Sequence, residues 1–196
     1  MSSGNNATGV STHVVHLTAK RLELLKEIAP RTRKVFALVS AHEVISRLAA
    51  KQLEEAAAKM GVKVVSREVS SNEDMEKILL QSWSAESDAV FYLPSVFVSK
   101  YIDRVVNKTL KEQMPLSVYE ETLLRAGALF SYGGDFKTFG VQAARLVAKV
   151  LRGEKPSNIP VETPEKLVLA INRATAKLLG SKISREAMAN ADRFVD

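Results

Sequence analysis

The residues best suited to bind a small molecule lie in the segment 131–135, which has the sequence SYGGD. Its two glycines permit a positive φ or the close approach of a ligand to the backbone. Tyr132 offers a ring face and a hydroxyl, and Asp135 can accept hydrogen bonds from an amine. We therefore expect Tyr132, Gly133 and Asp135 to bind ligand. The alternative is a glycine turn in which Asp135 only caps the next helix.

Further candidate residues follow the apolar runs that precede this segment. The residues at 40–42 open a predicted helix, where free N–H groups and the helix dipole suit a carboxylate, although a plain helix cap is an equal alternative. Ser70, Ser71 and Asn72 follow an edge strand and are expected to be a cap only. The candidate ligand-binding residues at the other strand ends and at 40–42 are Ser40, Ala41, His42, Pro94, Ser95, Tyr119 and Glu120.

Several kinds of chemistry are not supported by the sequence. The chain has 196 residues and no cysteine, which excludes disulfides, thiolate zinc sites and thiol nucleophiles. Of its three histidines, His13 and His16 could share a helix face, but no acidic residue stands at ligand spacing beside them, so we expect no metal site. There is no G-x-S-x-G motif and no phosphate-binding glycine loop. We expect a binding protein that is not an enzyme and that uses no cofactor.

The positive charge is a weak guide to function. The formal net charge is +6, but basic and acidic residues alternate along the predicted helices. Lys20, Arg21 and Glu23 are typical of a solvated helix face with ion pairs one turn apart. The densest basic cluster, at 31–34, has no interleaved aromatic residues. We therefore expect no nucleic-acid partner.

Apolar runs of strand length alternate with segments of helical periodicity. This alternation predicts βαβ units, and therefore an α/β fold of three layers, α/β/α, with a mainly parallel sheet. Two S-x-x-E patterns, at 40–43 and 70–73, predict capping boxes, and Gly61 ends the helix between them. In such a sheet, ligands bind at the carboxyl ends of the strands. The predicted strands are 35–39, 62–69, 88–93, 115–119, 127–132 and 167–171, and the predicted helices are 17–29, 43–60, 70–86, 96–113, 121–126, 136–151 and 174–179, followed by a polar tail.

An ordered set of motifs resembles a known family. The chain contains N-A-T-G-V-S, K-R-L-E-L-L-K-E-I-A-P, D-A-V-F-Y-L-P and G-A-L-F-S-Y-G-G-D, followed by L-R-G-E-K-P-S-N-I-P-V-E-T-P-E-K-L-V-L-A-I-N and T-A-K-L-L-G. From about Asn6 to its end, it resembles the substrate-binding component of ABC transporters, in the branch related to tryptophan- and tyrosine-binding proteins. The resemblance implies one lobe of a type I periplasmic-binding fold, in which a small solute is captured in a cleft between two lobes.

The same resemblance implies partners and a division of the chain. A small amino-acid-like or polar solute and an ABC transporter permease are the expected partners, and the expected compartment lies outside the cytoplasm. The chain shows no signal peptide and no first lobe, so as given it would be cytoplasmic. We expect residues 1–12 to be a polar start and inter-lobe crossing, and residues 13–135 to form an α/β lobe. Residues 136–160 are expected to be a helix and connection that pack on a missing first lobe. Residues 161–196 are expected to be the return strand and C-terminal helices of the lobe formed by 13–135.

The predicted helix 136–151 has an apolar stripe that this missing lobe would otherwise cover. We expect the isolated chain to form a homodimer through this helix; the alternative is a helix that folds back on its own lobe. Two other classes of function stay open. One is a ligand-sensing regulatory or stand-alone cytoplasmic domain of the same fold, and the other is a flavodoxin-like enzyme.

Overall fold

A computed structural model describes residues 5–181 and 183–196, so residues 1–4 of the predicted polar start lie outside it. The described chain divides into two compact units. The larger consists of residues 14–132 and 169–196, and the smaller of the described part of residues 1–13 together with residues 133–168. Each unit is described by itself below.

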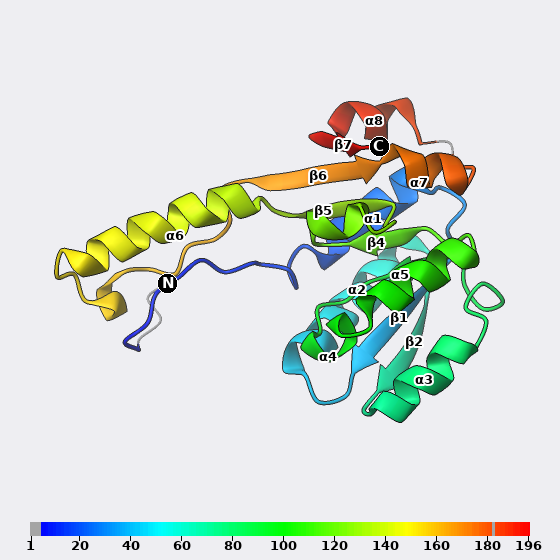
Figure 1. The fold of residues 1–196 in the computed structure, drawn as a ribbon, viewed down its shortest axis with the longest axis horizontal. Helices are drawn as coiled ribbons and strands as arrows, with labels where there is room; N and C mark the ends of the chain where they lie inside the picture. Colours follow the sequence, from blue (N-terminus) through cyan, green and yellow to red (C-terminus); the bar gives the residue numbers. More distant parts are fainter. Residues whose placement is uncertain (1–4, 182) are drawn as a thin grey trace. The chain divides into compact units, whose positions relative to one another are not determined.

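A seven-stranded sheet forms in the described residues, in the order β2-β1-β3-β4-β5-β6-β7 (Figure 1). Strand pairing is parallel between β1 and β2, β1 and β3, β3 and β4, β4 and β5, and β6 and β7. The mainly parallel α/β fold that the sequence predicts is therefore confirmed. The strands are β1 (Lys34–Ser40), β2 (Lys63–Val69), β3 (Ala89–Phe91), β4 (Leu116–Val118), β5 (Phe130–Gly134), β6 (Leu167–Asn172) and β7 (Arg193–Val195).

Helices cover both faces of the sheet in the larger unit. Successive side chains of a strand point to opposite faces, so one strand can contribute to the core on each side. Val35 and Ala37 of β1 join the core formed by α1 (Thr18–Ile28) and α2 (Val44–Met60). Phe36, between them, stacks on Trp83 with ring centroids 4.5 Å apart. Lys108 of α5 lies over the same indole, with its Nζ 5.1 Å from the ring centre, so α5 covers the face of the sheet to which Phe36 points. The other helices of this unit are α3 (Asn72–Leu80), α4 (Val96–Ser99), α5 (Ile102–Lys111), α7 (Arg173–Leu178), α8 (Arg185–Asn190) and the 3-10 helix η1 (Glu121–Leu124).

The helix starts differ from the two predicted capping boxes. At 40–43 the prediction is wrong: Ser40 belongs to β1, and α2 begins after Glu43 without a side-chain cap. At 70–73 a capping box is present, but one residue later, with Ser71 accepting from the amide of Asp74 at 3.1 Å. Local sequence thus marks a helix start to within a residue or two.

Other differences concern helix lengths and the C-terminal tail. The predicted helix 70–86 ends at Leu80, and the predicted helix 96–113 is interrupted between α4 and α5. The predicted polar tail contains α8 and strand β7, which pairs with β6. Strand β7 is only three residues long. A strand this short is stabilised by pairing with its neighbour, so its own sequence does not predict it.

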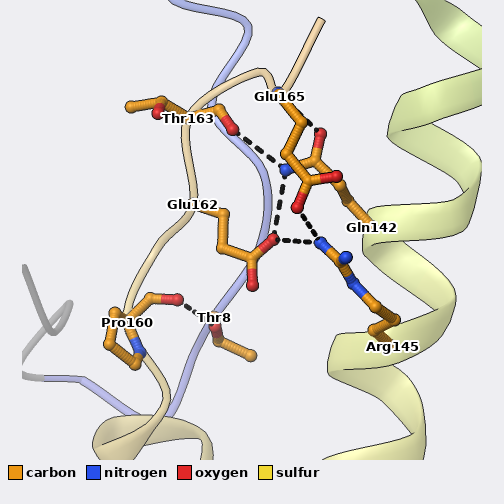
Figure 2. Close-up of polar contacts among 7 residues, drawn as sticks. All are labelled: Thr8, Gln142, Arg145, Pro160, Glu162, Thr163 and Glu165. Atoms are coloured by element: carbon orange, nitrogen blue, oxygen red, sulfur yellow. Dashed lines mark hydrogen bonds and ion pairs between the residues drawn. The ribbon is translucent and has the colours of Figure 1, made fainter.

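The smaller unit is organised around α6 (Phe136–Leu151), which has the predicted bounds. Gln142 of α6 is fully buried and donates to Glu162 and to the carbonyl of Thr163 at 3.1 and 2.9 Å (Figure 2). Its side-chain oxygen accepts from the amide of Glu165 at 3.2 Å. Arg145, one turn on, forms ion pairs with both glutamates. These contacts fasten the connection after α6, which includes the 3-10 helix η2 (Pro156–Asn158), back along the helix.

The N-terminal segment is bound to the same connection. The amide of Ser11 donates to the carbonyl of Glu162 at 2.8 Å, and the amide of Glu162 donates to Gly9 at 2.9 Å. The Thr8 hydroxyl donates to the carbonyl of Pro160 at 3.3 Å, as Figure 2 shows. Two segments far apart in the sequence therefore run side by side within this unit. None of the helices in the described part of the chain has the length and apolar character needed to cross a bilayer.

Substitution by alanine should change the free energy of unfolding in opposite directions at two glycines that have space for a side chain. Gly61 ends α2 at φ +66°, whereas Gly140 lies inside α6, and a Cβ added at either would meet no atom within 4 Å. We expect Gly61→Ala to lower the free energy of unfolding by about 1 kcal/mol, because an L side chain is strained at that φ. Gly140→Ala should raise it by about 0.5–1 kcal/mol, because alanine is the better helix former.

Thermal unfolding followed by circular dichroism measures both variants beside the wild type. A shift of about 2–4 °C per kcal/mol is expected for a chain of this size. Equal shifts in the same direction would contradict the assigned helix end at Gly61.

Candidate functional site

Aromatic and charged side chains meet at the carboxyl ends of strands in the larger unit. Tyr92 directly follows β3 and is buried, and Tyr119 directly follows β4 and is half-buried. Their rings are stacked, with centroids 5.5 Å apart and an interplanar angle of 7°. The two positions are brought together because β3 and β4 pair in parallel. Stacked tyrosines present an apolar face with polar tips, an arrangement suited to a ring-bearing ligand.

A buried arginine lies beneath this pair. Arg21 of α1 is fully buried, and its Nη2 donates to the carbonyls of Tyr92 and Ser117 at 2.7 and 3.1 Å. Its guanidinium carbon lies 4.2 Å from the ring centre of Phe91 and 5.6 Å from that of Tyr119. The sequence-based prediction of a solvated face is therefore wrong at this residue. A guanidinium in this position is held by carbonyl oxygens and aromatic faces instead of by water.

Arg21 is only partly satisfied by these contacts. Its Nε and Nη1 are buried and have no hydrogen-bond partner. Among the described residues no carboxylate forms an ion pair with it. Burial lowers the pKa of the guanidinium to about 9, which still leaves it protonated at neutral pH. The guanidinium is therefore a buried positive charge that no ion pair in the described part of the chain balances.

The tyrosine hydroxyls stay protonated at neutral pH. Burial, together with the carboxylate of Glu120, raises the pKa of Tyr119 to about 12. Burial also raises the pKa of Tyr92, with Tyr119, Glu120 and Glu43 acting in the same direction. Both phenols can therefore donate a hydrogen bond as well as accept one.

Glu43 and Ser95 connect the ends of β1 and β3. The Glu43 carboxylate accepts from the amide of Phe97 at 3.0 Å, and its second oxygen, Oε2, is buried without a partner. Ser95 is buried after Pro94 and caps α4, accepting from the amide of Val98 at 3.0 Å. The edge thus holds an acceptor with unused capacity beside the tyrosine pair.

The other predicted residues at the end of β1 are placed at this edge, but their amides are engaged. The Ser40 amide donates to the Ser46 hydroxyl at 3.0 Å, and the Ala41 amide donates to the Val69 carbonyl at 2.9 Å. His42 is exposed. The predicted role of Ser40 and Ala41 as carboxylate donors therefore has no geometric support from these amides.

The predicted segment 131–135 is divided between the two units. Tyr132 belongs to the larger unit, where it is half-buried against the core, and burial raises its pKa. Gly133 and Asp135 belong to the smaller unit. The glycines lie in β5 rather than in a turn, and a Cβ on Gly134 would come within 2.1 Å of the Phe139 ring. Asp135 precedes α6 and accepts from the Thr138 hydroxyl at 2.9 Å.

Sequence reasoning missed Arg21, Tyr92 and the orphan oxygen of Glu43. A signal for Arg21 was available, since it precedes Leu25 by four residues and Ile28 by seven and so shares their helical stripe. An arginine on an apolar stripe is rarely buried without a function. Within the described residues, no three His, Asp or Glu side chains are grouped so that they could hold a metal ion.

Comparison with known proteins relates this arrangement to a family. The sequence matches the family described as ABC transporter substrate binding protein over residues 1–195. It is 29% identical over 177 residues to a tyrosine-binding protein of Clostridioides difficile (strain R20291), covering 90% of this chain and 50% of that protein.

Solved structures with a similar fold are also known. A conserved domain protein from Vibrio cholerae superposes with a TM-score of 0.85 at 26% identity, covering 96% of this chain and 62% of that one. A protein from Streptococcus pneumoniae, solved in complex with L-Trp, gives a TM-score of 0.86 at 24% identity, covering 98% and 66%.

The matches cover nearly all of this chain but only part of each relative. The chain spans half the length of the curated relative and about two thirds of the solved ones. Because the family match extends over almost every residue of this chain, the chain belongs to the ABC transporter substrate binding protein family.

Proposed function

We propose that this chain is the partial, non-catalytic solute-binding component of an ABC importer, and that it binds a small amino-acid-like solute at the carboxyl ends of β1, β3 and β4. The observation that carries the proposal is the stacked pair Tyr92–Tyr119 with charged groups of both signs beside it. An aromatic amino acid has a ring, a cation and an anion, and each has a complementary group at this edge.

The related proteins support this class of solute. One relative is named a tyrosine-binding protein, and one solved structure of the same fold contains L-Trp. In our proposal the solute is enclosed between this edge and a second lobe, and closure favours the form that a membrane permease recognises. The working compartment is then outside the cytoplasm, where such a receptor meets its solute.

The chain alone should bind weakly, because a second lobe would supply the other half of the contacts. We expect a Kd of about 1 mM or weaker for L-tryptophan, equivalent to about 4 kcal/mol or less. Titration of the ¹⁵N-labelled chain by NMR measures it. The shifts should concentrate at residues 40–43, 92–95 and 119–120. Submicromolar binding would contradict the assignment of half a site.

Tyr119→Ala should weaken this binding several-fold, because it removes half of the stacked pair. The matched control is Tyr101→Ala, since Tyr101 is a tyrosine whose hydroxyl donates to Asn72 and whose ring lies against Phe97. If both variants bind L-tryptophan like the wild type, the site is not at this edge.

We also propose that the isolated chain pairs with a second copy through α6. Phe136, Val141, Val147 and Leu151 are all more than half exposed, and Leu151 is 82% exposed. On the same helix, Val147 and Val150 line an open pocket of about 390 Å³ together with residues 6–9 of the smaller unit. Exposed apolar side chains on one helix are typical of an interface.

Leu151→Lys should shift the wild-type dimer toward monomer, because a charge at this surface opposes its burial. Leu80→Lys is the control, since Leu80 at the end of α3 is 87% exposed and lies in the larger unit. Sedimentation velocity over a range of concentrations measures both. A wild-type chain that is monomeric at every concentration would contradict the proposal.

A further inference from the structure

The most unusual feature of the larger unit is a buried positive charge that the protein itself leaves unbalanced. Arg21 has no carboxylate partner among the described residues, and Nε and Nη1 have no acceptor. Transfer of a guanidinium from water into such a site is unfavourable unless other groups compensate. The two carbonyls and the aromatic rings offset only part of that cost.

The location of this charge links it to the binding edge. Its two hydrogen-bond acceptors are the carbonyl of Tyr92, directly after β3, and that of Ser117 within β4. It lies under the ring of Tyr119, and Tyr119 is half-buried whereas Phe91 on the other ring contact is fully buried. Of these two aromatic side chains in contact with the guanidinium, Tyr119 is therefore the one that reaches the surface.

The negative groups nearby do not neutralise it. Neither Glu43 nor Glu120 forms an ion pair with Arg21. Glu43 instead accepts from the amide of Phe97, and its second oxygen, Oε2, is buried without a partner.

We propose that Arg21 determines specificity at this edge by supplying the positive charge and the two unused donors that recognise the carboxylate of the solute. This inference rests on the proposed function and names the chemistry of the solute: a ring-bearing molecule with a carboxylate, whose amine faces Glu43, where Oε2 is buried without a partner. A solute without a carboxylate leaves the guanidinium unbalanced and binds more weakly.

The test compares three probes that share the indole ring. L-tryptophan carries both charges, tryptamine only the amine, and indole-3-propionate only the carboxylate. We expect the wild-type chain to bind L-tryptophan at least about tenfold more tightly than tryptamine. We also expect indole-3-propionate to bind more tightly than tryptamine. These comparisons need no variant and therefore do not depend on how Arg21 variants fold.

Variants then assign the preference to Arg21. Arg21→Met should bring the affinity ratio of L-tryptophan to tryptamine close to one, whereas Arg21→Lys should retain a preference for L-tryptophan because it keeps the charge. Arg104→Met is the matched control, since Arg104 on α5 is half exposed and paired with Glu76. It should leave the ratio unchanged. Circular dichroism confirms that each variant is folded before titration.

The outcomes separate this inference from the proposed function. If L-tryptophan and tryptamine perturb the same edge with equal affinity in the wild type, the binding site stands and the role of Arg21 is wrong. The same conclusion follows if folded Arg21→Met keeps the wild-type ratio. If no probe perturbs the edge even at the highest concentration at which it is soluble, the proposed function fails, and this inference fails with it.

Discussion

The burial of the Arg21 guanidinium constrains the arrangement of the larger unit. Its Nη2 needs acceptors, and the available ones are the carbonyls of Tyr92 and Ser117. Helix α1 must therefore lie where its side of the sheet brings the ends of β3 and β4 within reach. The same geometry places Tyr119 over the guanidinium, and Tyr119 in turn stacks on Tyr92. Burying a cation without an ion-pair partner is unfavourable, so its presence at a binding edge favours a role in function over one in stability.

Much of the fold follows from local pattern. The apolar run at 35–39 can only be a strand buried on both faces, and the structure buries Val35, Phe36 and Ala37 completely or nearly so. Gly61 ends α2 because the left-handed conformation there favours a residue without a side chain. Helix α6 has the predicted bounds since its apolar spacing and the glycine after it are unambiguous.

The errors arise where a distant partner decides the outcome. The S-x-x-E pattern at 40–43 is a sound local signal, but pairing with β2 keeps Ser40 in β1 and removes it as a cap. Strand β7 depends on β6, more than twenty residues earlier in the chain. Arg21 shows the same limit most clearly. Its neighbours Lys20 and Glu23 form the expected exposed ion pair, and only the two carbonyls at the sheet edge make the interior tolerable for Arg21.

The two units are incomplete in different physical ways. In the smaller unit, a fully buried Gln142 satisfies its hydrogen bonds within the unit, so the polar side of α6 is complete. The side chains of α6 that remain exposed include large apolar ones, and such side chains can be buried against another protein surface. The larger unit also exposes apolar side chains, such as Leu80 and Val96, but it differs in holding a buried charge that remains unbalanced. A charge of this kind is balanced by one anionic group, which a small solute can carry and then release. The difference supports both proposals, association through α6 and solute recognition at the edge around Arg21, because the two features need different kinds of partner.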